Sequence, residues 1–311
     1  MDMKLVFCGT PRFAVPSLER LAEAGFDLRL VVTQPDRPQG RGMELAAPPV
    51  KQSAIKLGLP VLQPEKIKKN EEFQRRLEEL KPDAIIVVGY GRIIPLWMLK
   101  LPPYGNINVH GSLLPRYRGA APIQWAIASG ERVTGVTTMH LNEGLDTGDI
   151  LLQEKLEIRP DETSVTLAPK LAGLGAELLV KTLHALRDKK IVARPQDHSL
   201  ASLAPLLTKE DGLVNFNRTA QEIHNRLRGF QPWPGAYTQF RGKNLKFISV
   251  RPTPARSKDD PGRLSISGEL HVSCGGGTVL QLLELQPEGK KPMSAREFVN
   301  GYRPTAGERL G

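Results

Sequence analysis

Apolar and polar positions follow one rhythm over the first two thirds of the chain. Nearly continuous apolar runs at 4–8, 28–33, 83–88 and 105–110 predict strands that are buried on both faces of a parallel sheet. Between these runs, apolar residues recur at helical spacing, for example along 13–21. Strands that alternate with helices predict the α/β class, with a Rossmann-like open sheet in the N-terminal part. The other expected strands are at 61–62, 132–141 and 150–157, and helices are expected from Pro11, at 51–57, 64–80 and 121–128, and from 161 to about 187.

The pattern changes beyond Thr208, where short alternating runs separated by glycines replace the longer elements. Such runs predict a small, closed or partly closed, OB-like β-barrel as the C-terminal domain. Residues 189–207 are polar with scattered prolines and are interpreted as a linker, so we predict a first domain over 1–188 and a second over 208–311. The expected barrel strands are at 212–216, 236–240, 245–250, 263–266, 269–273 and 278–285, with one helix at 219–228.

A long stretch rich in proline and glycine, residues 34–49, interrupts the expected sheet, and we expect it to be a structureless insertion loop. It carries Arg37 and Arg41 beside glycines, as does a segment that becomes ordered on a partner. A solvated surface loop without a function explains the same composition equally well, so the residues alone leave both interpretations open.

Polar side chains with catalytic potential gather where the strand at 105–110 ends. Asn108 and His110 are two positions apart, so in an extended strand their side chains leave on the same face. A glycine-containing turn at 142–149 carries Asp146, whose carboxylate could be held toward the same place. Local turn chemistry is the competing explanation for this aspartate, because Asp favours turns in any protein.

An amide, an imidazole and a carboxylate at one place suit acyl transfer to an amine. The amide and the imidazole can donate hydrogen bonds to the oxygen that becomes negative when a carbonyl turns tetrahedral. The carboxylate can hold the imidazole in the required protonation state and relay the proton of the amine. The chain contains no GxSxG or GxxxxGK[ST] sequence, and its first turn, GTPRFA, lacks the glycines of the dinucleotide fingerprint. Serine hydrolases, P-loop enzymes and nicotinamide-dependent enzymes are therefore disfavoured.

Composition narrows the class of protein further. Cys8 and Cys274 lie in different halves without a CxxC pair or a histidine cluster beside them, which argues against a zinc site or a disulfide framework. The apolar run at 5–8 is too short for a signal peptide, and no later run approaches membrane-spanning length. We therefore expect a soluble cytoplasmic protein without a bound metal. Nothing in the sequence demands a partner subunit, and we expect a monomer.

Positive charge is concentrated in the last third of the chain. The formal net charge is +10, and residues 208–311 carry 16 Lys and Arg against 10 Asp and Glu. This distribution is compatible with a polyanionic partner, because phosphates attract Lys and Arg largely without regard to sequence. Charge that only keeps the protein soluble is the simpler explanation, and charge alone favours it.

Two motifs of the chain are similar to the signature of one enzyme family. They are N-x-H-x-S-L-L-P-x-x-x-G at 108–119 and G-L-D-T-G-D at 144–149, and they resemble those of the formyltetrahydrofolate-dependent formyltransferases. Further segments resemble the branch of this family that acts on methionyl-tRNA. These segments are FCGTPRFAVPSL, TQPDRPQGRG, LPRYRGAAPIQWAI, FQPWPGA and LQPEGKKPMSA, which together extend from Phe7 to Ala295.

The resemblance implies that a formyl group is transferred from 10-formyltetrahydrofolate to the amino group of initiator methionyl-tRNA. It implies that Asn108 and His110 polarise the formyl carbonyl, and that Asp146 positions the histidine and assists proton transfer. It also implies that the folate lies against two segments of the first domain. These are Tyr90, Gly91, Arg92, Ile93 and Ile94, and then Ser112, Leu113, Leu114, Pro115 and Arg116.

For the tRNA, the resemblance implies contacts with the insertion loop and with the basic barrel. In the loop it points to Arg41 and less directly to Arg37. In the barrel, Lys290 and Lys291 lie on an expected turn, where phosphate contact and solubility both explain them.

Two other functions stand as alternatives. A formyltransferase that acts on glycinamide ribonucleotide or an amino sugar would share Asn108, His110 and Asp146 but would not require a basic barrel. A non-catalytic RNA-binding protein built on a degenerate enzyme domain would not require these three residues, and their presence argues against it.

Overall fold

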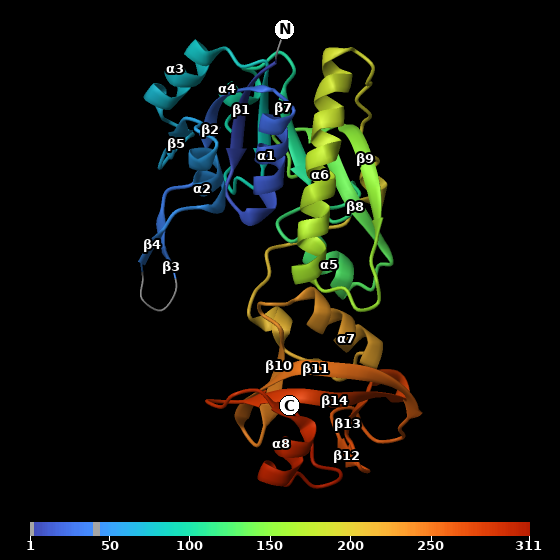
Figure 1. The fold of residues 1–311 in the computed structure, drawn as a ribbon. Coiled ribbons are helices and arrows are strands. Elements are labelled where there is room, and N and C mark those ends of the chain that lie inside the picture. The colour runs from blue at the N-terminus through green and yellow to red at the C-terminus, as the bar shows by residue number, and fades with distance from the viewer. Residues whose placement is uncertain (1–2, 40–43) are drawn as a thin grey trace. The chain divides into compact units, whose positions relative to one another are not determined.

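The computed structural model describes residues 3–39 and 44–311, and the chain forms two compact units (Figure 1). The first unit comprises Met1–Pro122, Val133–Glu157 and Ala168–Ala204, and the second comprises Ile123–Arg132, Ile158–Leu167 and Pro205–Gly311. Residues 189–204, most of the stretch interpreted as a linker, thus belong to the first unit. The domain limits 1–188 and 208–311 stay a prediction.

A seven-stranded sheet forms the centre of the first unit. Its strands are β1 (Lys4–Gly9), β2 (Asp27–Val32), β5 (Val61–Leu62), β6 (Ala84–Val88), β7 (Asn106–His110), β8 (Val133–His140) and β9 (Ile150–Glu157). They lie in the order β5-β2-β1-β6-β7-β8-β9. The pairs from β5 through β7 are parallel, and β8 runs antiparallel to both of its neighbours, β7 and β9. The predicted α/β class and the Rossmann-like sheet are confirmed. From β1 the chain first adds β2 and β5 on one side of the sheet and then adds β6 and β7 on the other side. Open sheets of this type bind ligands at the carboxyl ends of the strands near the point where the order reverses, here between β1 and β6.

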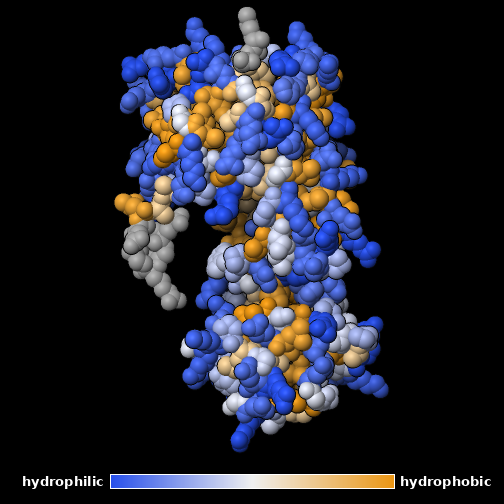
Figure 2. Space-filling view, viewed as in Figure 1, coloured by the Kyte–Doolittle hydropathy of each residue, from blue (hydrophilic) through white to orange (hydrophobic). Residues whose placement is uncertain are grey.

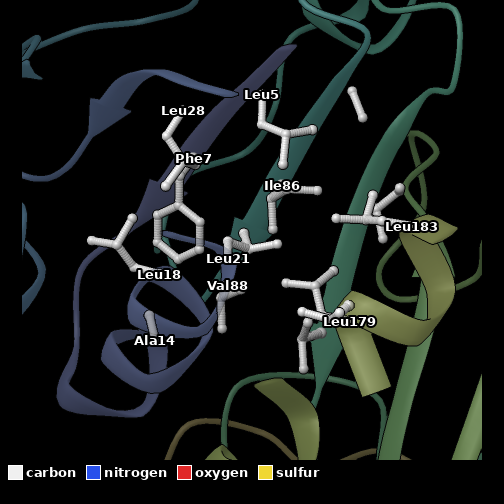
Figure 3. Packing of buried hydrophobic residues seen from close by; sticks show 14 of the residues in the cluster. Leu5, Phe7, Ala14, Leu18, Leu21, Leu28, Ile86, Val88, Leu179 and Leu183 are labelled. Carbon is white, nitrogen blue, oxygen red and sulfur yellow. The ribbon is translucent and has the colours of Figure 1, made fainter. Parts of the chain in front are cut away.

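Helices cover both faces of this sheet. They are α1 (Val15–Glu23), α2 (Pro49–Lys56), α3 (Glu71–Leu80), α4 (Leu96–Leu99) and α6 (Ser164–Arg187), with short 3-10 turns at Arg12–Ala14 and His198–Leu200. On one face, Leu18 of α1 and Leu183 of α6 lie in one buried cluster with Phe7 (Figure 3). On the other face, Phe73 of α3 and Met98 of α4 lie in a second cluster. The strands are therefore buried on both sides, as their continuous apolar runs predict.

Two elements of the first unit differ from the prediction. The helix expected from residue 64 begins only at Glu71, because the Asn70 side chain accepts a hydrogen bond from the backbone N–H of Phe73 (2.9 Å) and so fixes the N-terminus there. The insertion at 34–49 is not wholly structureless, since β3 (Arg37–Gln39) pairs antiparallel with β4 (Glu44–Ala46).

An antiparallel sheet forms the core of the second unit. Its strands are β10 (Ala236–Phe240), β11 (Lys243–Arg256), β12 (Leu264–Ile266), β13 (Leu270–Cys274), β14 (Thr278–Pro287) and β15 (Met293–Ser294), and its helices are α5 (Pro122–Ala128), α7 (Ala220–Gly229) and α8 (Ala295–Tyr302). The order is β10-β11-β14-β13-β12, with β15 also paired to β14. Gly307 N–H donates to Leu264 of β12 (2.8 Å) and Gly311 N–H to Gln239 of β10 (3.0 Å), so the last residues bond to both edge strands. The sheet is thereby partly closed, which agrees with the predicted partly closed barrel.

One expectation for the second unit is wrong, and one of its helices was not predicted. Residues 212–216 do not form a strand. Gly212 is the last residue of a 3-10 turn that begins at Glu210, and Leu213 forms an isolated bridge to Tyr237. Helix α8 was not predicted, although Ser294 and Glu297 form a capping box at its start that the sequence carries openly.

Polar residues cover much of the face seen in the space-filling view (Figure 2). Figure 2 shows hydrophilic residues over most of the visible face of each unit. Among the described residues, no helix combines the length and the apolar character needed to span a membrane. Over the same residues, no group of three or more His, Cys, Asp and Glu side chains is arranged to hold a metal ion.

Candidate active site

Strand β7 presents apolar residues on one face and polar residues on the other. Ile107 and Val109 lie in the cluster under α1 and α6, so the alternate residues leave the opposite face. Of these, Asn106 donates two hydrogen bonds to backbone carbonyls of α4 (2.9 and 3.1 Å). Asn108 and His110 follow it on that face, and they are 8% and 6% exposed. The predicted common face of Asn108 and His110 is confirmed.

The imidazole of His110 lies between a backbone carbonyl and a carboxylate. Its Nε2 is 2.9 Å from the carbonyl oxygen of Tyr117, and its Nδ1 is 3.7 Å from Oδ2 of Asp146. Because a carbonyl oxygen can only accept, Nε2 carries the hydrogen of this bond. Nδ1 is therefore the nitrogen at which the ring gains or loses a proton, and it faces Asp146. The structure thus brings together two residues that lie far apart in the sequence.

Asp146 is held from two sides. Its Oδ2 accepts a hydrogen bond from the backbone N–H of Gly119 (2.8 Å), and its backbone carbonyl accepts one from the side chain of Gln196 (2.8 Å). Its φ of +50° lies in the left-handed region, which Asp tolerates in turns, but both of its hydrogen bonds come from residues that are distant in the sequence. Local turn preference alone therefore does not account for the position of this carboxylate.

The loop after His110 is fixed from behind by strands β8 and β9. The hydroxyl of Thr137 donates to the carbonyl of Ser112 (2.7 Å) and accepts from the N–H of Leu114 (3.1 Å). Gln153 donates to the carbonyl of Leu114 (2.9 Å), and Ser112 Oγ donates to the carbonyl of Arg116 (2.6 Å). The side chains of Ser112 and Leu114 are buried, so they shape this loop.

The remaining candidates of this loop differ in exposure. Leu113 and Pro115 are partly exposed, and Arg116 is exposed with its guanidinium 5.2 Å from the centre of the Tyr117 ring. The three side chains can therefore reach a ligand, unlike those of Ser112 and Leu114.

The segment from Tyr90 to Ile94 follows β6 at the edge of the sheet where ligands are expected. The Tyr90 side chain is 1% exposed and belongs to the core, and burial raises the pKa of its hydroxyl. Its carbonyl accepts hydrogen bonds from Thr10 (3.2 Å) and Gln34 (3.1 Å), which join the turn after β1 to this segment. Only the backbone of Tyr90 can therefore contact a ligand.

The other residues of this segment are more accessible. Gly91 is exposed with φ of +76°, and Arg92 donates to the carbonyl of Glu65 (2.5 Å). The side chain of Ile93 is 90% exposed, whereas Ile94 packs partly against the core.

The basic candidates lie in both units. Arg37 is exposed on β3 of the first unit, and Lys290 and Lys291 are exposed on the turn between β14 and β15 of the second. Arg41 lies outside the described residues.

Two residues that support the site were not found from the sequence. Gln196 and Arg118 are 5% and 7% exposed, and the glutamine accepts two hydrogen bonds from the guanidinium (2.6 and 3.1 Å). Gln196 lies in a polar stretch without periodicity, so no sequence signal distinguishes it. Arg118 belongs to the motif at 108–119, but at a position that the motif leaves unspecified.

Comparisons with known proteins identify the family of the chain. The family model described as "Formyl transferase" matches residues 3–183, and the one described as "Formyl transferase, C-terminal domain" matches residues 206–303. Over 310 residues, the chain is 64% identical to the methionyl-tRNA formyltransferase of Koribacter versatilis (strain Ellin345), covering 99% of each chain. It is 57% identical to that of Acidobacterium capsulatum, covering 99% of this chain and 100% of the relative.

Solved structures share the fold at low sequence identity. The sugar 3N-formyl transferase WlaRD, in the presence of dTDP and 5-N-formyl-THF, matches with a TM-score of 0.67 and 18% identity, covering 94% of this chain and 100% of that one. HypX from Aquifex aeolicus, in complex with tetrahydrofolic acid, matches with a TM-score of 0.58 and 17% identity, covering 99% of this chain and 49% of that one. The family models and the curated relatives span both units, and the chain therefore belongs to the formyltransferase family.

Proposed function

We propose that the chain transfers a formyl group from 10-formyltetrahydrofolate to the free amino group of initiator methionyl-tRNA and so produces N-formylmethionyl-tRNA for translation initiation. The curated relatives named methionyl-tRNA formyltransferase support the acceptor, since they match over the full chain at up to 64% identity. The observation that carries the chemistry is the approach of Asp146 to the Nδ1 of His110 (3.7 Å) beside Asn108 on the same strand face. In this proposal the protein acts as a monomer in the cytoplasm.

The roles of the three residues follow from their hydrogen bonds. The donor supplies a formyl carbon that an amine can attack. Within residues 3–39 and 44–311, no hydrogen bond of the Asn108 side chain is found, so its amide can donate to a carbonyl oxygen that turns negative. Losing one such donor typically raises a barrier by roughly 2.7 to 4 kcal/mol. His110 accepts the proton of the attacking amine at Nδ1, and the carboxylate of Asp146 stabilises the imidazolium that results. When the tetrahedral intermediate collapses, the bond between the formyl carbon and N10 breaks, and N10 takes this proton and leaves as the amine of tetrahydrofolate.

The folate contacts are proposed on the exposed parts of two segments. Ile93 exposes 90% of an apolar side chain, and covering such a side chain with an aromatic ring removes apolar surface from water. The exposed, left-handed Gly91 lets a flat ligand approach the backbone. The buried side chains of Tyr90, Ser112 and Leu114 support contact through their backbone groups only.

The tRNA contacts are proposed on an exposed basic surface of the second unit, formed by Lys246, Lys290 and Lys291. Lys246 on β11 stands opposite Gln286 on β14, so the two side chains share one face of the sheet. Gln286 donates to the carbonyl of Lys290 (2.9 Å), which brings the turn with both lysines beside Lys246. Tyr237, partly exposed, is the cross-strand neighbour of Lys246 on β10. Three ammonium groups on one surface suit phosphates, which attract charge without regard to sequence.

Contacts of Arg37 and Arg41 with the acceptor end of the tRNA belong to the same proposal. Arg37 lies exposed on the β3–β4 ribbon, which supports contact with a polyanion. Substituting Arg41 by alanine would then impair the reaction mainly at limiting tRNA.

Parallel reactions with three acceptors test the proposed function. Formyl-labelled tetrahydrofolate is supplied with charged initiator tRNA, with glycinamide ribonucleotide, or with an amino sugar, and His110→Ala protein is run beside each as a control. We expect label on the methionyl-tRNA alone, and none with the variant. Label on the ribonucleotide or the sugar but not on the tRNA would overturn the assignment of the acceptor. Initiator and elongator methionyl-tRNA, compared in the same assay, show whether the chain distinguishes them.

A further inference from the structure

We propose that Gln196 is a positioning residue that holds Asp146 in its working orientation. The inference rests on the role proposed for Asp146 and concerns a residue that does not touch the reacting groups. It assigns a function in catalysis to the stretch after α6, which the sequence pattern indicates only as a linker.

All four hydrogen-bonding positions of the Gln196 amide are used. Its Nε2 lies 2.8 Å from the carbonyl oxygen of Asp146 and 2.7 Å from that of Gly148, and its Oε1 accepts from Nε (3.1 Å) and Nη2 (2.6 Å) of Arg118. The reverse orientation of the amide would set its oxygen against two carbonyls and its NH₂ against a cation. A buried amide whose donors and acceptor are all satisfied fixes the groups around it, because leaving any of them unpaired costs free energy.

The identity of the residue indicates what it does. A glutamate at this position would pair with Arg118 and neutralise its buried charge, but it would turn oxygens toward the carbonyls of Asp146 and Gly148. Only an amide can accept from the guanidinium and donate two hydrogen bonds to the catalytic turn at the same time. An amide at this position therefore suits a residue that holds the turn of Asp146, whereas a carboxylate would suit one that neutralises Arg118.

The same network of hydrogen bonds also holds the carboxylate of Asp146. Arg118 precedes Gly119, whose backbone N–H donates to Oδ2 of Asp146 (2.8 Å). The backbone of Arg118 is itself fixed, since its N–H donates to the carbonyl of Ser202 (2.8 Å) and its carbonyl accepts from Ala204 N–H (2.7 Å). The backbone and the carboxylate of Asp146 are thus both tied to one rigid frame.

This frame matters because Asp146 has an unfavourable backbone conformation. With φ at +50°, Asp146 lies in a sparsely populated backbone region, and the two Gln196 donors satisfy the carbonyls of Asp146 and Gly148 that would otherwise be left without these bonds. A carboxylate displaced from His110 impairs proton transfer without removing any group that binds the substrates. A displacement of about 1 Å can lower a rate on the order of 10²-fold.

The test substitutes Gln196→Glu, which keeps the size and the acceptor for Arg118 but removes both donors. We expect kcat to fall by about 10²-fold while KM for the formyl donor and for methionyl-tRNA stays as in the unsubstituted protein. Gln74→Glu is the matched control, because Gln74 donates to Glu78 on the exposed face of α3. Unchanged kcat in Gln196→Glu would overturn the proposal.

A double-substitution cycle separates positioning from general damage. If Gln196 acts through Asp146, Gln196→Glu costs little further activity in an Asp146→Asn background, whereas a merely structural role gives the same loss in both backgrounds and refutes the inference. Full activity of Asp146→Asn alone would remove the proposed role of Asp146, and this inference with it. If Gln196→Glu does not fold, as judged by circular dichroism and thermal unfolding, the cycle is run with Gln196→Met, whose apolar side chain suits the neighbouring Met139.

Discussion

Around His110, Asp146 is held by a network of hydrogen bonds that includes the buried Gln196 and Arg118, whereas Lys246, Lys290 and Lys291 in the second unit are exposed. The groups of the first region hold one another in place, because Gln196 bonds both to the backbone of Asp146 and to Arg118, and the next residue, Gly119, bonds to the Asp146 carboxylate. In the described part of the chain, no hydrogen bond or ion pair of the three ammonium groups is found, so the second region supplies charge density alone. Reaction chemistry needs groups held within a fraction of an ångström, while attraction of a polyanion needs only that positive charges lie on one surface. Substitutions should therefore act steeply and cooperatively in the first region, and weakly and additively in the second.

The largest effect is expected for His110→Ala. The variant loses the nitrogen that accepts the proton, so kcat should fall by roughly 10² to 10⁴-fold, the usual range for general acid–base help. Affinity for tRNA, measured by filter binding, should change little because the basic surface is intact. His271→Ala, in the second unit, is the control. A variant with normal turnover would remove His110 from the mechanism.

Asn108→Ala should have the next largest effect. Removing a donor to a developing oxyanion lowers kcat by about 10² to 10³-fold. Single-turnover rates with bound substrates measure this directly, since they exclude product release. If only KM for the formyl donor rises, Asn108 binds the donor and does not stabilise the oxyanion.

Gly119→Ala tests how rigid the first region is. A Cβ at this residue would lie 2.7 Å from the carbonyl oxygen of Ala204, and its φ of +119° does not suit a side chain. We expect a loss of about 1 to 3 kcal/mol in the free energy of unfolding and lower activity, because the Gly119 N–H also holds Asp146. Gly173→Ala is the control, since nothing lies within 4 Å of its Cβ on helix α6. Equal unfolding midpoints for the two variants would contradict the tight packing described here.

Single substitutions of Lys246, Lys290 and Lys291 by alanine should be mild. Each should weaken tRNA binding and reduce the slope of log affinity against log salt by about 0.9 or less per lost phosphate contact. At saturating tRNA, kcat should be normal. Lys258→Ala, exposed elsewhere in the second unit, should leave the slope as it is. A fall in kcat without a change in the salt slope would show that the basic surface does more than attract charge.

The smallest effect concerns His224 on α7, a half-buried polar group of the second unit. Burial, and then the charge of Arg228, lower the pKa of His224 to about 4, from an ordinary value near 6.5. Between these values the unfolded chain binds more protons than the folded one, so this histidine reduces stability as the pH falls from about 6.5 to 4. Urea unfolding at several pH values should show that the free energy of unfolding depends less on pH in His224→Gln than in the unsubstituted protein. Parallel curves would show that His224 titrates normally.

Much of the catalytic region could be predicted because its signals are local. The alternation along β7 places Asn108 and His110 on one face by strand geometry alone. The glycines around Asp146 mark a constrained turn, although its approach to His110 depends on contacts between distant segments. The buried side chains of Tyr90, Ser112 and Leu114 were harder to foresee, since a motif names residues without saying which side chains point into the core.

The supporting residues could not be predicted, for a physical reason. Gln196 and Arg118 act through hydrogen bonds to backbone carbonyls and to each other, and such bonds leave no periodicity or spacing in a sequence. Lys246 was missed because only the register of β11 against β14 places it near the turn that carries Lys290, and the sequence does not give this register. The start of α3 at Glu71 was missed because one cap, Asn70, outweighs the helical composition of the residues before it.

The bonds between residues 202–204 and 117–121 determine how the molecule can be divided. Ser202 Oγ accepts from the N–H of Tyr117 (2.9 Å), and the carbonyl of Ala204 accepts from the N–H of Ala121 (3.1 Å). A truncated protein that ends at the C-terminus of α6 would keep Asn108, His110 and Asp146 but lose every one of these bonds, together with Gln196. A truncation after Ala204 would retain them. A minimal catalytic fragment should therefore not end before Ala204, and because segments 123–132 and 158–167 belong to the second unit, a fragment that ends there would expose their packing surfaces.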